Sequence, residues 1–350
     1  MSLPTNYNIL KKIPTTKEII DYAPLSAKAK QKIEKDRKEV KNILEGKDNR
    51  LLLIVGPCSA WPEKAVLNYA EKLIQLEEKV NERIKIVMRV YIQKPRTTKG
   101  WVGPIIQPDP FKQPDLEAGM KYSRKMMVDV VEMGLPIADE ALSTQNADVF
   151  LELLSWVAIG ARSSEDQEHR IFASAIECAV GLKNPTHGSL KIGVNSIVAA
   201  QYNHISAMNG YEVETNGNQH AHLVLRGSNH GPNFSNLHLL EVKKHMEDQK
   251  IKNPAVVIDI SHDNCLLNGK KDHLLQINNI FEILENIKDR PDLKKLVKGF
   301  MVESFIQDGC QPILTDQPEK INLNGLSITD PCLGWDKTEE LILNLYEKLK

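Results

Sequence analysis

The sequence predicts an α/β fold, a (β/α)₈ barrel that carries an N-terminal helical arm and an inserted β-ribbon near its sixth strand. Eight short apolar segments recur along the chain, and each is followed by a stretch with helical spacing. The segments are apolar on both faces, which is typical of a parallel sheet covered by helices. Eight such units fit a closed barrel well, and a doubly wound sheet with a cap domain is the structural alternative.

The order of these segments gives the expected organisation. The predicted strands lie at 51–59, 84–92, 136–142, 156–162, 179–184, 221–227, 255–262 and 297–304, with clear helical spacing at 63–80 and 117–134. Residues 1–48 are expected to form an N-terminal extension with one helix. Residues 49–350 would form the barrel, with the β-ribbon inserted at about 204–219.

Composition limits the classes of function. The 350 residues are 41% hydrophobic, and 45 basic against 46 acidic residues give a net charge of -1. We therefore expect neither nucleic acid nor a membrane surface as partner. No run of 18 apolar residues occurs, the amino terminus lacks a secretory pattern, and the five cysteines are widely spaced. These features indicate a cytoplasmic protein with reduced thiols. Neither GxGxxG nor GxxxxGK[ST] is present.

Chemically active side chains stand at the predicted carboxyl end of every strand, where barrel enzymes build their sites. Six of them are cations, namely Arg89, Lys94, Arg96, Arg162, Lys183 and Arg226. Arginine binds phosphate or carboxylate in a bidentate manner, and lysine adds a point charge. Six cations at one mouth would repel each other unless anions occupied the site. The set therefore predicts a site for phosphorylated substrates.

A second set of strand-end residues suits a metal. Cys58, His262 and Glu303 end the first, seventh and eighth predicted strands, and Asp330 follows the last one as a fourth ligand. Thiolate, imidazole and carboxylate together favour a divalent ion such as Mn, Fe, Co or Zn. A nucleophilic role for Cys58, with His262 as its base, is an alternative that the sequence leaves open.

Eight segments resemble the type I 3-deoxy-D-arabino-heptulosonate 7-phosphate (DAHP) synthases, in the feedback-regulated microbial branch. They are GPCS (56–59), MRVYIQKPRTTKGWVG (88–103), SWVAIGARSSEDQEHR (155–170), GLKNPTHGSLK (181–191), HLVLRG (222–227), IDISHDN (258–264), MVES (301–304) and SITDPCLGW (327–335). They run in order through roughly 300 residues. The resemblance implies a (β/α)₈ transferase that condenses phosphoenolpyruvate with erythrose 4-phosphate at the first step of the shikimate pathway.

The resemblance also implies roles for the site residues. The metal would be held by Cys58, His262, Glu303 and Asp330. Phosphoenolpyruvate would be bound by Arg89, Lys94, Arg162, Lys183 and Arg226, with the backbone of Gly160 and Ala161 around its phosphate. Erythrose 4-phosphate would lie against Pro95, Arg96 and Thr97. Lys94 and His262 would handle protons, and Glu140 would orient or activate water.

Two points separate this chain from related enzymes. The sister 3-deoxy-octulosonate 8-phosphate synthases, which use arabinose 5-phosphate, are expected to read KANRS where this chain has KPRTT (94–98), so the four-carbon aldose is favoured. At the aromatic amino acid effector pocket implied by the resemblance, Ser143, Ala147 and Glu177 depart from the family pattern. The enzyme is then either insensitive to feedback or sensitive to a different aromatic acid. By the same resemblance, residues 1–48 would contribute to subunit contacts and regulation of the catalytic barrel, so a homodimer or homotetramer is expected.

Overall fold

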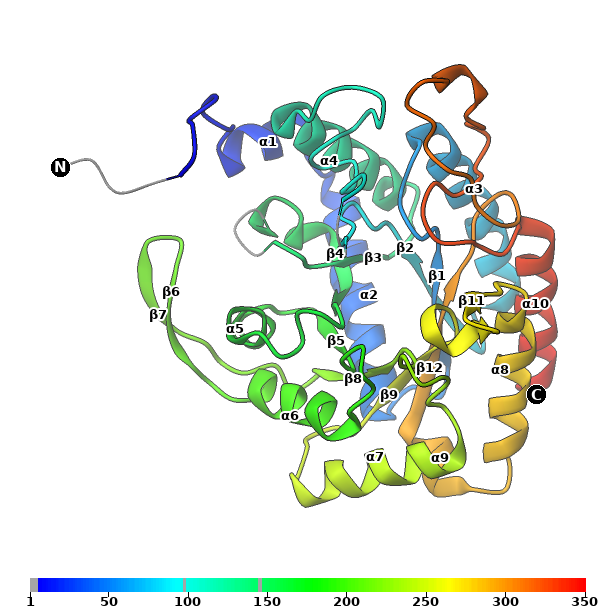
Figure 1. The fold of residues 1–350 in the computed structure, drawn as a ribbon. Helices are drawn as coiled ribbons and strands as arrows, with labels where there is room; N and C mark the ends of the chain where they lie inside the picture. Colours follow the sequence, from blue (N-terminus) through cyan, green and yellow to red (C-terminus); the bar gives the residue numbers. More distant parts are fainter. Residues whose placement is uncertain (1–5, 97–98, 144–146) are drawn as a thin grey trace.

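Eight parallel strands close into a barrel in the computed structural model, which describes residues 6–96, 99–143 and 147–350 (Figure 1). The closed order is β1-β12-β9-β8-β5-β4-β3-β2. The strands are β1 (Leu51–Gly56), β2 (Ile84–Arg89), β3 (Ile137–Glu140), β4 (Leu154–Ile159), β5 (Ala179–Lys183), β8 (His222–Leu225), β9 (Val256–Asp259) and β12 (Val297–Glu303). The predicted barrel is confirmed, and the doubly wound alternative is wrong.

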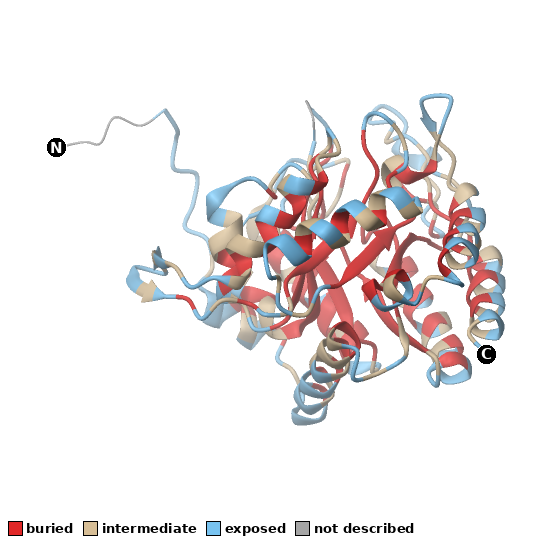
Figure 2. Cartoon of the chain, turned by 90° about the horizontal axis from the view of Figure 1, so that it is seen from below, coloured by how far each residue is buried: buried red, intermediate tan, exposed pale blue. Residues whose placement is uncertain are grey.

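Amphipathic helices surround the strands, and their buried stripes face inward (Figure 2). They are α3 (Glu63–Val80), α4 (Leu116–Glu132), α5 (Gln167–Ala175), α6 (Leu190–Gln201), α7 (Asn236–Asp248), α8 (Leu275–Ile287), α9 (Pro291–Leu296) and α10 (Trp335–Lys348). The helix predicted over 63–80 is α3, and its observed bounds agree with the prediction. No helix in the described ranges is long and apolar enough to cross a membrane.

The segment before the barrel contains two helices, α1 (Thr16–Tyr22) and α2 (Ala27–Glu45), so the expectation of one helix was wrong. Each begins at a capping side chain, since Thr15 and Ser26 accept hydrogen bonds from backbone N–H groups in the first turn. Ala23, Pro24 and Leu25 separate them, and a proline disfavours helical backbone in the residue before it.

Helix α2 covers the amino-terminal end of the barrel. Its apolar residues Val40, Ile43 and Leu44 belong to the same buried cluster as Leu52 and Trp156 of the barrel interior. On its preceding turn the buried Asp36 accepts a hydrogen bond from the buried Lys85 Nζ at 2.6 Å. The core is therefore continuous through the barrel, which leaves the carboxyl-terminal end as the open one.

Two segments project on the same side of the barrel. An antiparallel hairpin, β6 (Ile205–Met208) paired with β7 (Tyr211–Glu214), follows α6, and it projects to the left in Figure 1, as does the N-terminal segment. Both carry exposed apolar side chains, including Ile9 at 86% and Leu10 at 93% exposure, with Ile205 and Tyr211 on the hairpin. The hairpin lies within the stretch predicted to form a β-ribbon.

A buried histidine in the barrel predicts a pH-dependent stability. His222 accepts a hydrogen bond from Trp156 Nε1 at 3.1 Å, and burial lowers its pKa to about 4. An unfolded histidine titrates near pH 6.5, so between pH 6.5 and 4 the unfolded state binds more protons. This stabilisation is complete above pH 6.5 and is lost as the pH falls toward 4, by about 3 kcal/mol in total.

The variant His222→Gln keeps an acceptor for Trp156 but does not titrate. Urea unfolding between pH 4.5 and 8.5 should therefore show a shallower loss of stability on the acid side than in wild type. The difference between the two proteins should be constant above pH 7, which serves as the internal control. Parallel curves over the whole range would contradict the assignment to His222.

Candidate active site

The open end of the barrel contains a cavity of about 250 Å³. Its lining includes Lys94, Pro95, Arg96, Glu140, Gly160, Ala161, Arg162, Lys183, Arg226, His262 and Asp330, all predicted site residues. Cys58, Arg89 and Glu303 are fully buried close by. Thr97 lies outside the described residues. The structure thus brings together side chains from every barrel strand or the loop that follows it.

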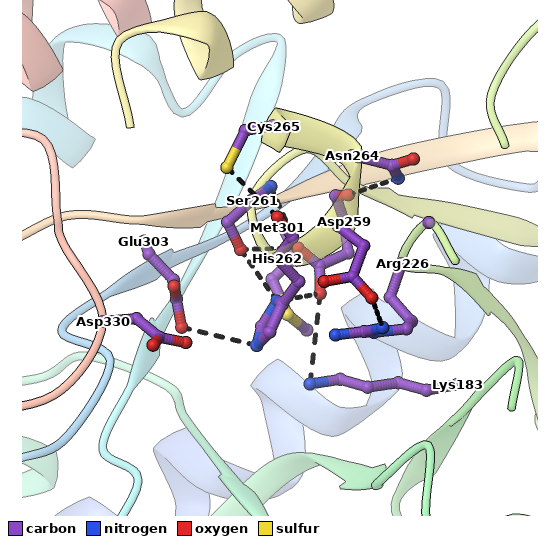
Figure 3. A network of polar contacts seen from close by, with 12 residues as sticks. Lys183, Arg226, Asp259, Ser261, His262, Asn264, Cys265, Met301, Glu303 and Asp330 are labelled. Carbon is purple, nitrogen blue, oxygen red and sulfur yellow. Dashed lines mark hydrogen bonds and ion pairs between the residues drawn. The ribbon is translucent and has the colours of Figure 1, made fainter. Parts of the chain in front are cut away.

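Three of the four predicted metal ligands form one compact group. A ligand atom from each of Cys58, Glu303 and Asp330 lies within 4.8 Å of the others. His262 approaches from the loop after β9, with Nε2 3.6 Å from Glu303 Oε1 (Figure 3). One thiol, one imidazole and two carboxylates match the preferences of a borderline divalent ion, so the residues present fit a metal of this kind.

Electrostatics at this group favour anionic carboxylates and a neutral imidazole. Burial raises the pKa of Glu303, but the positive charges of Arg89 and Lys271 oppose this, and the net shift is downward. Burial likewise raises the pKa of Asp330, and Lys271 and Lys94 oppose this, so that it lies below its usual value. Burial holds the pKa of His262 well below 6.5, despite the nearby Glu303 carboxylate. A neutral imidazole keeps a lone pair for a metal.

The Cys58 thiol is not activated as a nucleophile. Burial, and then the Glu303 carboxylate, raise its pKa to about 11. Reactive cysteines have a lowered pKa, so this environment disfavours the covalent alternative. A cation in the group would reverse the shift, because metal coordination deprotonates a thiol. Lys94 Nζ already donates hydrogen bonds to Cys58 O at 2.6 Å and to Sγ at 3.1 Å.

The strand-end cations are partly neutralised by the protein itself. Arg89 donates to Glu303 Oε1 at 3.1 Å, Lys183 to Glu140 Oε2 at 3.1 Å, and Arg226 pairs with Asp263. The expectation that bound anions alone relieve their repulsion therefore needs correction. Buried carboxylates hold the cations in place while the cavity remains rich in positive charge.

Glu140 lies directly against the backbone at the end of β4. A Cβ atom at Gly160 would come within 2.5 Å of Glu140 Oε1, so only glycine admits the carboxylate there. Burial raises the pKa of Glu140, but Lys183 and Lys94 lower it by more than burial raises it. The group is therefore an anion at neutral pH. Glu140 is therefore able to accept a proton or orient water.

Three charged residues at the site were missed by sequence reasoning. Lys271 lines the cavity and pairs with Asp330, Asp263 pairs with Arg226, and Asp259 lies beneath His262. Both aspartates stand in IDISHDN, so the chemistry of that segment was visible but the pairing was not. Lys271 returns to the cavity through a small hairpin, β10 (Leu266–Leu267) with β11 (Lys270–Lys271), that the sequence did not indicate.

This combination of fold and site defines a class. A (β/α)₈ barrel with cations and a thiol–imidazole–carboxylate group at its carboxyl end is suited to join phosphorylated substrates beside a divalent metal. A family model described as the DAHP synthetase I family matches residues 25–343. The chain belongs to this family, and it is an enzyme of the transferase class.

Individual relatives agree over nearly the full length. A Trp-sensitive phospho-2-dehydro-3-deoxyheptonate aldolase from Enterobacter agglomerans is 39% identical, over 93% of this chain and 91% of the relative. A Tyr-sensitive one from Escherichia coli is 36% identical, over 93% and 90%. The solved structure of the Francisella tularensis aldolase of this name has a TM-score of 0.90 and 35% identity, covering 98% of both chains. These relatives support the 3-deoxy-7-phosphoheptulonate synthase activity over the octulosonate alternative.

Proposed function

We propose that the open end of the barrel binds phosphoenolpyruvate and erythrose 4-phosphate side by side next to a divalent metal, and condenses them with water to DAHP and phosphate. The observation that carries this proposal is one cavity at which strand-end cations lie beside Asp330 and His262, with Cys58 and Glu303 grouped around the same Asp330. Fixing two anionic substrates in register there would supply much of the rate, because it removes the entropy cost of their encounter.

The metal would be held by Cys58, His262, Glu303 and Asp330, with Mn, Fe, Co and Zn all compatible with this donor set. When bound, it supplies Lewis acid polarisation near the aldehyde oxygen of the sugar. Three of these side chains are almost fully enclosed by protein, which strengthens every charge interaction in the group.

Phosphoenolpyruvate would occupy the cationic part of the cavity. Its phosphate and carboxylate would be bound by Arg89, Lys94, Arg162, Lys183 and Arg226, with the backbone of Gly160 and Ala161 beside the phosphate. Erythrose 4-phosphate would lie against Pro95 and Arg96, together with Thr97. Arg96 donates to Trp101 O at 2.7 Å, which holds its guanidinium at the edge of the cavity.

The chemistry needs a carbon–carbon bond and an addition of water. The enol carbon of phosphoenolpyruvate attacks the aldehyde carbon, water adds at the carbon that carries the phosphate, and phosphate leaves. Lys94 and His262 would handle protons around the aldehyde oxygen. Glu140 would orient the water or take its proton, since its carboxylate faces the cavity beside Gly160.

Assembly, location and regulation complete the proposal. Exposed apolar side chains on the N-terminal segment and on the β6–β7 hairpin support a homodimer or homotetramer. All five cysteines are free, which supports a cytoplasmic location. The departures at Ser143, Ala147 and Glu177 support two regulatory alternatives, insensitivity to feedback or sensitivity to a different aromatic acid.

A direct assay tests the function. Phosphoenolpyruvate consumption is followed with erythrose 4-phosphate or arabinose 5-phosphate, with and without chelator, and with each aromatic amino acid. We expect turnover with the four-carbon sugar alone, loss with chelator and recovery on adding Mn, while the response to phenylalanine, tyrosine and tryptophan separates the two regulatory alternatives. Metal-independent turnover or a preference for the five-carbon sugar would overturn the proposal.

A further inference from the structure

A buried carboxylate without an assigned role lies between the two halves of the site. Asp259 ends β9 and is completely buried. Its Oδ1 accepts hydrogen bonds from Ser261 Oγ at 2.6 Å and from Ser261 N at 3.1 Å. Its Oδ2 lies 2.7 Å from His262 Nδ1 and 3.9 Å from Lys183 Nζ, and forms no conventional hydrogen bond within the described residues (Figure 3). The Ser261 hydroxyl, which donates to Oδ1, also lies 2.9 Å from His262 Nδ1 and is therefore an acceptor for a proton on that nitrogen. A buried carboxylate oxygen without a hydrogen bond destabilises the folded state unless neighbouring polar groups compensate for its lost hydration.

We propose that Asp259 is a positioning residue that orients His262 toward the metal and couples metal affinity to the binding of phosphoenolpyruvate. With a carboxylate at Nδ1, that nitrogen carries the proton, and Nε2 presents its lone pair to the group formed by Glu303 and Asp330. The inference rests on the proposed function, because it requires the metal at His262 and the anion at Lys183.

The surrounding backbone holds this geometry rigidly. His262 has a left-handed conformation with φ of 47°, which is unfavourable for a residue with a side chain. The Asn264 side chain donates to Asp259 O at 2.7 Å and to Leu225 O at 3.1 Å, and so ties the turn to two strands. Because the backbone is fixed, the direction of the imidazole depends on the two groups at its Nδ1, the Asp259 carboxylate and the Ser261 hydroxyl that this carboxylate holds.

The coupling between anion binding and metal binding arises at Asp259 Oδ2, because this oxygen lies next to both Lys183 Nζ and His262 Nδ1. Lys183 shares its charge between Asp259 Oδ2 and Glu140 Oε2. An anion bound at Lys183 draws this charge away, and Asp259 then interacts more strongly with the Nδ1 proton of His262. A more basic Nε2 binds the metal more tightly, and by linkage the metal strengthens anion binding by the same factor.

The variant Asp259→Asn separates these effects. Ser261 donates twice to Oδ1, so the amide oxygen would take that place and the amide NH₂ would face His262 Nδ1. A donor there moves the imidazole proton to Nε2, the nitrogen required by the metal. We expect the dissociation constant for Co(II), measured by chelator competition without substrate, to rise about 10- to 100-fold. The wild-type tightening of Co(II) binding by phosphoenolpyruvate, about 5-fold or more, should vanish.

Two further variants keep the test decisive. Asp36→Asn also replaces a buried, ion-paired aspartate, but at the opposite end of the barrel, and should lose stability with unchanged Co(II) affinity. Ser261→Ala removes one hydrogen bond from Asp259 and the hydroxyl at His262 Nδ1, and should weaken Co(II) binding about 2- to 10-fold, which provides the answer if Asp259→Asn does not fold. Wild-type Co(II) affinity together with wild-type coupling, in both Asp259→Asn and Ser261→Ala, would overturn the inference. Failure of wild type to bind Co(II) would instead contradict the proposed metal site.

Discussion

Replacing Lys94 by Met is expected to lower kcat by about 10³-fold while Co(II) or Mn(II) still binds. Burial lowers the pKa of Lys94, but Cys58 and Glu303 outweigh it and raise it, so the group is an ammonium ion at neutral pH. That charge sits against the Cys58 thiol and at the wall of the cavity, where both substrates would meet. Methionine keeps the length of the side chain and removes the charge and the proton.

The measurement combines steady-state phosphate release with metal titration. Lys99→Met is the matched control, because Lys99 is exposed in the same loop and has no role in the site, and it should retain wild-type kcat. Metal affinity in Lys94→Met should equal or exceed that of wild type, since a cation that competes for Cys58 has been removed. A kcat within tenfold of wild type would remove Lys94 from the catalytic machinery.

Replacing Cys58 by Ala should weaken Co(II) or Zn(II) binding by on the order of 10³-fold, and abolish turnover at micromolar metal. The thiolate is the soft ligand of the set, and the remaining imidazole and carboxylates bind these ions less selectively. The variant should also lose the thiolate-to-metal absorption of the Co(II) protein. This optical signal reports on the ligand itself rather than on activity.

Cys178→Ala is the control for this change. Cys178 is also a buried free thiol, but it precedes β5 at the other end of the barrel. Burial raises the pKa of its thiol to about 11, as it does for Cys58, so the two residues differ in position rather than in intrinsic reactivity. The control should bind metal normally with some loss of stability. Equal metal content in both variants would rule out Cys58 as a ligand.

Local pattern was sufficient for the barrel elements. The helix at 63–80 has apolar residues at helical spacing, and its bounds were predicted correctly because its buried stripe needs no knowledge of distant residues. Strand ends were less exact. The predicted strand at 84–92 ends at Arg89, since the chain there leaves the sheet to form the loop that carries Lys94. The apolar residues Val90, Tyr91 and Ile92 follow the end of the strand, so apolar composition overestimates the length of the strand.

The arm before the barrel shows where pattern alone fails. Its charged residues suggested an appended segment, yet Asp36 is buried against Lys85, and Val40 and Ile43 complete the barrel core. In the sequence, the charged residues of a buried ion pair cannot be told from those of a solvent-exposed helix face, because burial depends on which element packs against the helix.

The active site also has features that the sequence predicts and features that depend on the tertiary structure. The sequence by itself determined which chemical groups stand at the carboxyl ends of the strands, because a parallel barrel sends all those ends to one mouth whatever its loops do. Only the tertiary structure decided how the charges are shared. It paired Arg89 with Glu303, folded Lys271 back onto Asp330, and placed Asp259 between His262 and Lys183. Coulomb energies and hydrogen bonds depend on distances of a few ångströms, which order along a chain does not specify.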